Sequence, residues 1–277
     1  MGYSQIEVKL LSFWGSDRSV AEGAWASTYD QEVQQQKSNE DVQSLVKRLV
    51  YNDHSTPKER VWLEFYMKVP IFVERQADKY RMTIQEQDFQ IDYLHAPMGR
   101  EGITQNELSG RYRTMPDNPY LMPEDVAVVM AKAAGFHEGA LVDDAYLDSA
   151  AGTFKAFWDE RVQAQHNSYS HFLSKLKEAE KAGAITNAEY KRAREVLRGE
   201  LGTTYMTEMR MCLNMHAFEH IINQRLAPDS QLECRIMAAL MLKEVMESGA
   251  CPAMIEQMYF KNNWQDSYAK ILAVLSV

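Results

Sequence analysis

Nine residues at positions 61–69, VWLEFYMKV, are rich in β-branched and aromatic side chains and favour a β-strand. Pro70 follows, and because proline is tolerated in the first turn of a helix, the Ile-Phe-Val run after it predicts a helix. Upstream, residues 6–14 (IEVKLLSFW) start with alternating polarity and predict a strand that ends at Gly15. Between these strands, residues 38–51 repeat apolar side chains at helical spacing. The first third is therefore expected to mix α and β structure.

From Pro123 onward, the apolar pattern is helical almost throughout, and Gly and Pro residues punctuate it. No internal repeat, low-complexity tail or linker interrupts the chain. We therefore expect one α+β domain over residues 1–277, with a small mixed sheet in the first half and a largely helical second half. The expected later helices are at about 123–134, 154–180, 187–198, 203–225, 229–248 and 252–262.

The composition excludes several classes of protein. The 277 residues include 30 Lys+Arg and 39 Asp+Glu, a formal net charge of −9, so no nucleic-acid partner is expected. A small anionic ligand in a local basic pocket remains compatible with this charge. The apolar runs fall short of the roughly 20 residues of a membrane-spanning helix, and the first residues lack a secretory signal pattern. A cytoplasmic protein without a membrane segment is expected.

Metal and thiol chemistry have weak support in the sequence. Cys212, Cys234 and Cys251 are an odd number without a Cys-x-x-Cys pair, which argues against a disulfide framework and a cysteine-bound zinc, and predicts buried thiols. His216 and His220 belong to an H-x-x-E-H pattern, the zinc signature of inverted zincins. This pattern leaves open the alternative of a zinc-dependent hydrolase, although the sequence does not identify a third zinc ligand.

Three polar clusters stand out within this chain. The densest is QNELSGRYR at 105–113, where a glycine permits close backbone approach and arginines suit phosphate oxygens. The second, RQADKYR, covers 75–81. The third interrupts the apolar 203–225 segment with Asn, His and Arg side chains and continues into 231–235. Polar groups on an apolar helix need partners, either neighbouring side chains or a ligand.

Together these clusters resemble the flavin-dependent thymidylate synthases, the ThyX family, whose signature is R-H-R, a short spacer and N-E-x-S-x-R-Y. The second half of the signature is intact at Asn106–Tyr112. The other matches keep the family's order along the chain: 24–27 (AWAS), 54–57 (HSTP), 70–76 (PIFVERQ), 193–197 (AREVL), and 214–225 with 231–233.

The resemblance implies a ThyX-like fold and an enzyme that methylates dUMP to dTMP. It implies methylenetetrahydrofolate as the carbon donor, FAD as the cofactor, NADPH as the reductant and a homotetramer. Arg225 and Glu107 are the implied catalytic residues. The implied dUMP-binding residues are Gln76, Lys79, Glu107, Leu108, Ser109, Gly110, Arg111, Arg194 and Arg225. The implied FAD-binding residues are Ser27, His54, Thr56, Arg81, Asn214, His216 and His220. No metal is implied.

The chain also departs from the family pattern. Lys-Tyr-Arg at 79–81 stands where R-H-R is expected, and 24 residues separate Arg81 from Asn106, which indicates an insertion at about 82–104. In a second register, Arg100 supplies the basic residue beside the signature. His216 replaces a family arginine. These changes leave open a dUMP hydroxymethylase on the same fold, in which water completes the carbon transfer, and a non-catalytic helical scaffold.

Overall fold

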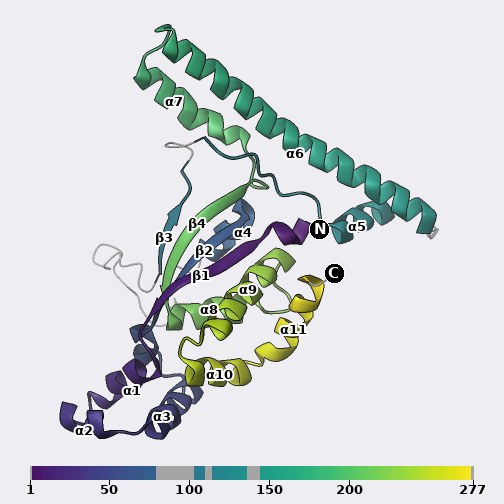
Figure 1. The fold of residues 1–277 in the computed structure, drawn as a ribbon. Helices are drawn as coiled ribbons and strands as arrows, with labels where there is room; N and C mark the ends of the chain where they lie inside the picture. Colours follow the sequence, from purple (N-terminus) through teal and green to yellow (C-terminus); the bar gives the residue numbers. More distant parts are fainter. Residues whose placement is uncertain (1, 79–102, 110–113, 136–143, 276–277) are drawn as a thin grey trace, which may run out of the picture. The chain divides into compact units, whose positions relative to one another are not determined.

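A computed structural model describes residues 2–78, 103–109, 114–135 and 144–275 (Figure 1). Its contacts divide the chain into two compact units, each built from separate stretches of sequence. Unit 1 comprises Met1–Gln5, Val69–Phe72 and Leu108–Thr207, and unit 2 comprises Ile6–Lys68, Val73–Glu107 and Glu208–Val277. The expectation of a single domain over the whole chain stays a prediction.

A four-stranded sheet, most of whose residues belong to unit 2, has the strand order β1-β2-β4-β3 (Figure 1). Its strands are β1 (Glu7–Trp14), β2 (Trp62–Pro70), β3 (Ile103–Glu107) and β4 (Met206–Asn214). β1 is antiparallel to β2, and β3 is antiparallel to β4. Every second side chain of β2 is buried, which matches the two-residue period of a strand with one face on a core.

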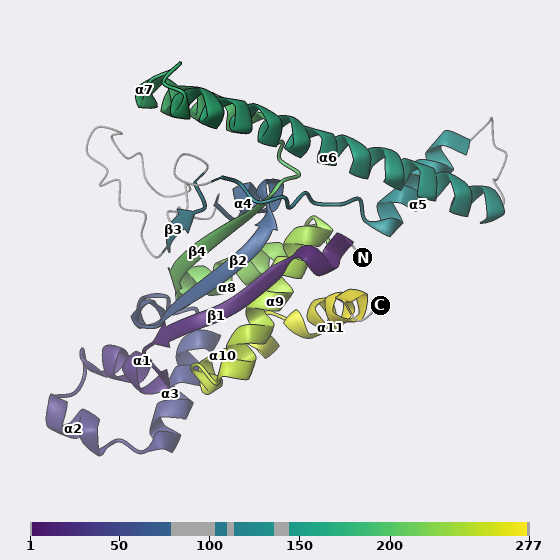
Figure 2. The same ribbon diagram turned by 45° about the horizontal axis from the view of Figure 1, so that its top comes forward.

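Helices α8 (Met215–Arg225) and α9 (Leu232–Ser248) pack against this sheet (Figures 1 and 2). α9 contacts β1, and Phe218 of α8 stacks on Phe65 of β2 with ring centroids 6.2 Å apart. Two further helices, α10 (Pro252–Lys261) and α11 (Trp264–Leu275), continue from α9.

The remaining helices of unit 2 are short. They are α1 (Asp17–Trp25), α2 (Gln31–Gln36), α3 (Asn39–Tyr51), the 3-10 helix η2 (Thr56–Arg60) and α4 (Ile71–Asp78), whose first two residues are assigned to unit 1. Ser38 and Asp41 form a capping box that fixes the start of α3. Asp17 accepts hydrogen bonds from the backbone N–H groups of Ala253 and Met254, so the start of α1 caps α10. These contacts attach the N-terminal helices to the C-terminal ones.

Unit 1 is largely helical. It contains η1 (Gly2–Gln5), α5 (Glu124–Gly135), the long α6 (Asp144–Lys181), α7 (Asn187–Leu197) and η4 (Arg198–Glu200). α6 contacts both α5 and α7, and aromatic side chains fill the core beside α7. No described helix combines the length and the apolar character that a bilayer crossing requires.

The predicted strands at 6–14 and 61–69 and the helix after Pro70 are confirmed, as are the helices near 123–134, 187–198, 229–248 and 252–262. The helix predicted at 154–180 begins earlier, at Asp144. The helix predicted at 203–225 is wrong in its first half, because residues 206–214 form β4. The strand does alternate, because Met209, Met211 and Leu213 are buried while Arg210 between them is exposed, but this short alternation runs directly into the apolar helix α8. α1, α2 and α11 were not predicted.

Candidate active site

Arg225 and Gln76, both implied nucleotide contacts, meet in unit 2. Arg225 is the last residue of α8, and Gln76 lies on α4. Arg225 Nη1 donates to Gln76 Oε1 at 3.2 Å, and Nη2 donates to the Gln76 carbonyl oxygen at 3.2 Å. Two hydrogen bonds from one planar guanidinium fix its orientation as well as its position. The structure therefore places a fixed cation beside α4.

Two further side chains join this pair. Cys234 Sγ donates to Gln76 Oε1 at 3.3 Å, and Gln76 Nε2 donates to Gln231 Oε1 at 2.6 Å. Burial raises the pKa of Cys234 to about 11, although the nearby Arg225 opposes the shift. Cys234 thus holds its proton at neutral pH. The sequence pointed to Gln231 through the family pattern, but nothing in it marked Cys234 as a polar partner.

Strand β3 is attached to α4 by another pair. Gln105 Nε2 donates to Glu74 Oε1 at 2.6 Å, and Glu74 is only 7% exposed. Gln105 and Glu107 lie on the same face of β3 because side chains two residues apart point the same way. The contact therefore attaches the strand that carries Glu107 to the helix that carries Gln76. Glu74 was not predicted as a site residue. The sequence signal that could have identified it is a carboxylate directly after the apolar run at 71–73.

The described dUMP residues of unit 1 gather around one aromatic core. Leu108 packs against the cluster of Met115, Tyr169, Tyr190 and neighbouring residues, with Ser109 next to it in the chain. Arg194 lies one helical turn after Tyr190 on α7, so both share a helix face. Arg194 Nε and Nη2 are buried and have no hydrogen-bond partner among the described residues. These donors suit an anion.

The other signature residues lie outside the described residues: Lys79, Arg81, Arg100, Gly110, Arg111 and most of the insertion predicted at 82–104. Its last two residues, Ile103 and Thr104, start β3 and pair with Leu213 and Cys212.

The described residues implied for FAD surround η2. This 3-10 helix starts at Thr56, two residues after His54, and contacts both α1 and α8. Ser27 lies in the turn after α1, where its hydroxyl donates to the Ala24 carbonyl oxygen at 3.0 Å. His216 and His220 lie on α8. The fold thus brings the three separate sequence segments to one short helix.

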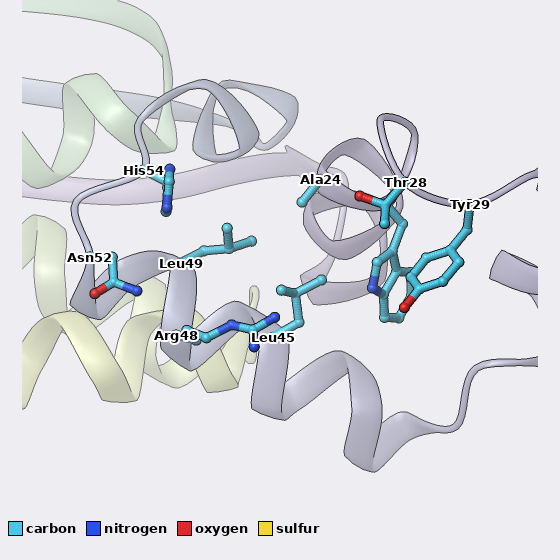
Figure 3. A pocket seen from close by; sticks show the side chains of 9 residues that line it. Ala24, Thr28, Tyr29, Leu45, Arg48, Leu49, Asn52 and His54 are labelled. Atoms are coloured by element: carbon cyan, nitrogen blue, oxygen red, sulfur yellow. The ribbon is translucent and has the colours of Figure 1, made fainter.

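A cavity of about 260 Å³ opens between α1, α3 and the turn before η2. Figure 3 shows its lining side chains, which include Arg48 and Leu49 of α3, Asn52 and His54 of the following turn, and Tyr29. Aromatic side chains form part of its wall. Drug-sized ligands need roughly 300–1,000 Å³, so this cavity suits one ring or one polar group of a larger ligand.

Asn214 and His216 lie at the start of α8. Asn214 is the N-cap, and its Oδ1 accepts from the backbone N–H of Ala217 at 2.9 Å. This bond explains why a buried asparagine stands at the junction of β4 and α8. His216 Nδ1 is buried and without a hydrogen-bond partner in the described ranges. The flavin contacts implied for both residues stay predictions.

The glutamate of the H-x-x-E-H pattern has a structural role. Glu219 Oε2 accepts from Lys58 Nζ at 2.5 Å, and Glu219 Oε1 accepts from Asn262 Nδ2 at 2.9 Å. Lys58 is 2% exposed, so this is a buried ion pair that ties η2 to α8. A glutamate bonded in this way is not available as the general base of a zinc hydrolase. Within the described ranges, no three His, Cys, Asp or Glu side chains are grouped to hold a metal ion.

His220 provides a prediction on pH. His220 lies at the exposed side of α8, where partial desolvation lowers its pKa, the neighbouring His216 adds to the shift, and Glu219 opposes it. The folded protein therefore binds this proton less readily than the unfolded chain, whose histidine pKa is about 6.5. Below about pH 6.5, the free energy of unfolding should fall as His220 is forced to protonate. Urea unfolding between about pH 8 and 5 should give a shallower pH dependence for His220→Gln than for the native chain.

A matched control for this measurement is His171→Gln, which changes an exposed histidine of α6. It should leave the pH dependence unchanged. Equal slopes for all three proteins would show that His220 does not contribute to the acid sensitivity.

Comparison with known proteins identifies the family of this chain. The family model described as thymidylate synthase complementing protein (Thy1) matches residues 9–252. The chain belongs to this family. The predicted family, the enzyme class and the α+β fold are therefore confirmed.

Several relatives of this Thy1 family protein are named flavin-dependent thymidylate synthase. The protein from Rickettsia conorii is 25% identical over 238 residues, which are 86% of this chain and 71% of the relative. The protein from Thermus thermophilus is 27% identical over 240 residues, 87% of this chain and 71% of the relative. A crystal structure of a UMP/dUMP methylase from Streptomyces cacaoi with 5-Br dUMP has the same fold, with a TM-score of 0.62 at 18% identity. The similarity covers 91% of this chain and 94% of that one.

Proposed function

We propose that this Thy1 family enzyme methylates C5 of dUMP to give dTMP, with methylenetetrahydrofolate as the carbon donor, FAD as the cofactor and NADPH as the reductant. The observation that carries the proposal is the fixed guanidinium of Arg225, held by the side chain and the main chain of Gln76. A uracil ring becomes nucleophilic at C5 when negative charge develops on its N3, O2 and O4 atoms. A preorganised cation at this charge lowers the barrier to that step.

The cysteines support a mechanism without an enzyme nucleophile. Burial raises the pKa of Cys234 to about 11 and that of Cys251 to about 12, and it also raises the pKa of Cys212. The thiolate is the reactive form, so these thiols are poor nucleophiles at neutral pH. Activation of the ring is therefore assigned to charge stabilisation by Arg225, with Gln76 as its positioning residue and Glu107 as a further contact.

The residues around η2 fit part of a flavin. The cavity has aromatic walls for a ring and carries Arg48 and His54 for polar groups, and the Nδ1 atom of His216 is buried without a described partner. When bound, FAD supplies a redox-active ring that carries hydride equivalents from NADPH. We assign its binding to Ser27, His54, Thr56, Arg81, Asn214, His216 and His220.

The phosphate of dUMP is assigned to Arg111, Arg194 and Ser109, with Lys79, Leu108 and Gly110 as the neighbouring contacts. Replacement Arg194→Ala should weaken dUMP binding by about 1.5–3 kcal/mol, or roughly 10- to 150-fold, because it removes charge-assisted hydrogen bonds. Calorimetric titration with dUMP measures the loss. Deoxyuridine, which has no phosphate, should bind native and variant proteins equally.

Arg192→Ala is the matched control, since Arg192 is an exposed residue of the same helix that faces Glu195. It should leave dUMP binding unchanged. If Arg194→Ala binds dUMP as tightly as the native enzyme, Arg194 does not contact the phosphate.

A homotetramer and a cytoplasmic location complete the proposal, which includes no nucleic-acid or membrane partner. The test is incubation of the purified protein with FAD, NADPH, methylenetetrahydrofolate and dUMP, followed by mass analysis of the nucleotide. We expect a product heavier by one methylene unit, which is dTMP. A hydroxymethylated product would show that the enzyme is a dUMP hydroxymethylase. Unchanged dUMP would refute both the methylase and the hydroxymethylase activity.

A further inference from the structure

The amide of Gln76 has three hydrogen-bond partners. Its Oε1 atom accepts from Arg225 Nη1 at 3.2 Å and from Cys234 Sγ at 3.3 Å. Its Nε2 atom donates to Gln231 Oε1 at 2.6 Å. All four residues belong to unit 2 and come from α4, the end of α8 and the start of α9.

These partners determine which way the amide points. A guanidinium has only donors, so the Gln76 atom that faces Arg225 must be the oxygen. Cys234 lies in the core and holds its proton, and it acts as a second donor to the same oxygen. A flipped amide would direct its NH₂ group at two donors and lose both contacts.

The remaining capacity of the amide follows from counting its lone pairs and protons. A carbonyl oxygen has two lone pairs, and Arg225 and Cys234 use both. The NH₂ group has two hydrogens, and Gln231 accepts one of them. Its second hydrogen has no partner among the residues that the structure describes. Toward a ligand, Gln76 can therefore donate but not accept.

We propose that Cys234 is a specificity-determining positioning residue, because its bond to Gln76 Oε1 restricts that amide to donating toward the nucleotide. This arrangement selects a pyrimidine that presents a carbonyl oxygen, such as uracil, and disfavours one that presents an amino group, such as cytosine. The inference rests on the proposed function, which puts a pyrimidine nucleotide beside Gln76 and Arg225. Without the thiol, one lone pair of Oε1 is open to the amino group of cytosine.

The experiment compares dUMP and dCMP binding to the native enzyme and to Cys234→Ala by calorimetric titration. The ratio of the two dissociation constants should favour dUMP in the native enzyme and fall by about 3- to 10-fold in Cys234→Ala, the scale of one neutral hydrogen bond. Cys234→Ser retains a donor at this position and should restore the native ratio. Cys251→Ala removes another buried thiol, at the N-terminus of α10, and should leave the ratio unchanged.

A ratio in Cys234→Ala within about twofold of the native ratio would overturn the proposal, as would an equal fall in Cys234→Ser, because a packing effect would then explain the change. If the native enzyme binds dUMP but the ratio does not depend on Cys234, the proposed function stands and only the role of Cys234 is refuted. A native enzyme that binds neither nucleotide removes both.

Discussion

Arg225→Ala should abolish conversion of dUMP, with a loss of at least about 100-fold in turnover, while the protein remains folded. Removal of one preorganised charge-stabilising group typically costs about 10²–10³-fold in rate. Here the variant removes a half-buried guanidinium and also releases the Gln76 amide that it orients. Release of tritium from dUMP labelled at C5 measures the step, because methylation at C5 must expel that hydrogen.

Arg210→Ala is the control for this prediction. Arg210 lies on β4, is largely exposed and faces Glu64 at 3.4 Å, so the variant removes an arginine that is not among the proposed nucleotide contacts. It should retain nearly native turnover. Full activity in Arg225→Ala would remove Arg225 from the mechanism.

Lys58→Met should lower the free energy of unfolding by about 3–5 kcal/mol, the usual effect of breaking a buried ion pair. Methionine fills a similar volume but leaves the carboxylate of Glu219 buried with Asn262 as its remaining described partner. The change should also loosen η2 from α8, because the pair joins these two elements. Urea unfolding monitored by circular dichroism gives the value.

Two further variants isolate this effect. Lys47→Met breaks an exposed lysine–glutamate pair between α3 and α10 and should cost less than about 1 kcal/mol. The double variant Lys58→Met with Glu219→Leu should recover most of the lost stability, since it removes the stranded charge. Equal losses for Lys58→Met and Lys47→Met would contradict the role of the buried pair.

Much of the fold was predictable because local patterns and tertiary packing agree. The sequence 61–69 is rich in β-formers, and the proline that follows it does lead into α4. β4 was missed because its short alternation of buried Met209, Met211 and Leu213 with exposed Arg210 runs directly into the apolar helix α8, and the placement of β4 between β2 and β3 is a non-local property. A short strand pattern is hard to separate from a helix pattern when the helix follows it without a break.

For the site too, sequence motifs identified individual residues, whereas their partners depend on the fold. Motifs identified Gln76 and Arg225, and the fold joins them although 149 positions separate them in the sequence. The roles of Lys58, Glu219 and Cys234 depend on partners from distant elements, so no spacing in the sequence predicts them. Glu219 belongs to the H-x-x-E-H pattern of a zinc site, but in the fold it forms a buried ion pair with Lys58.

The most direct test of the central claim is a map of the protein at atomic resolution after soaking with dUMP. We predict density for the uracil ring against the Arg225 guanidinium and the Gln76 amide, with no bond from the base to a cysteine. Nucleotide density remote from Arg225, or a covalent link to a thiol, would contradict the account.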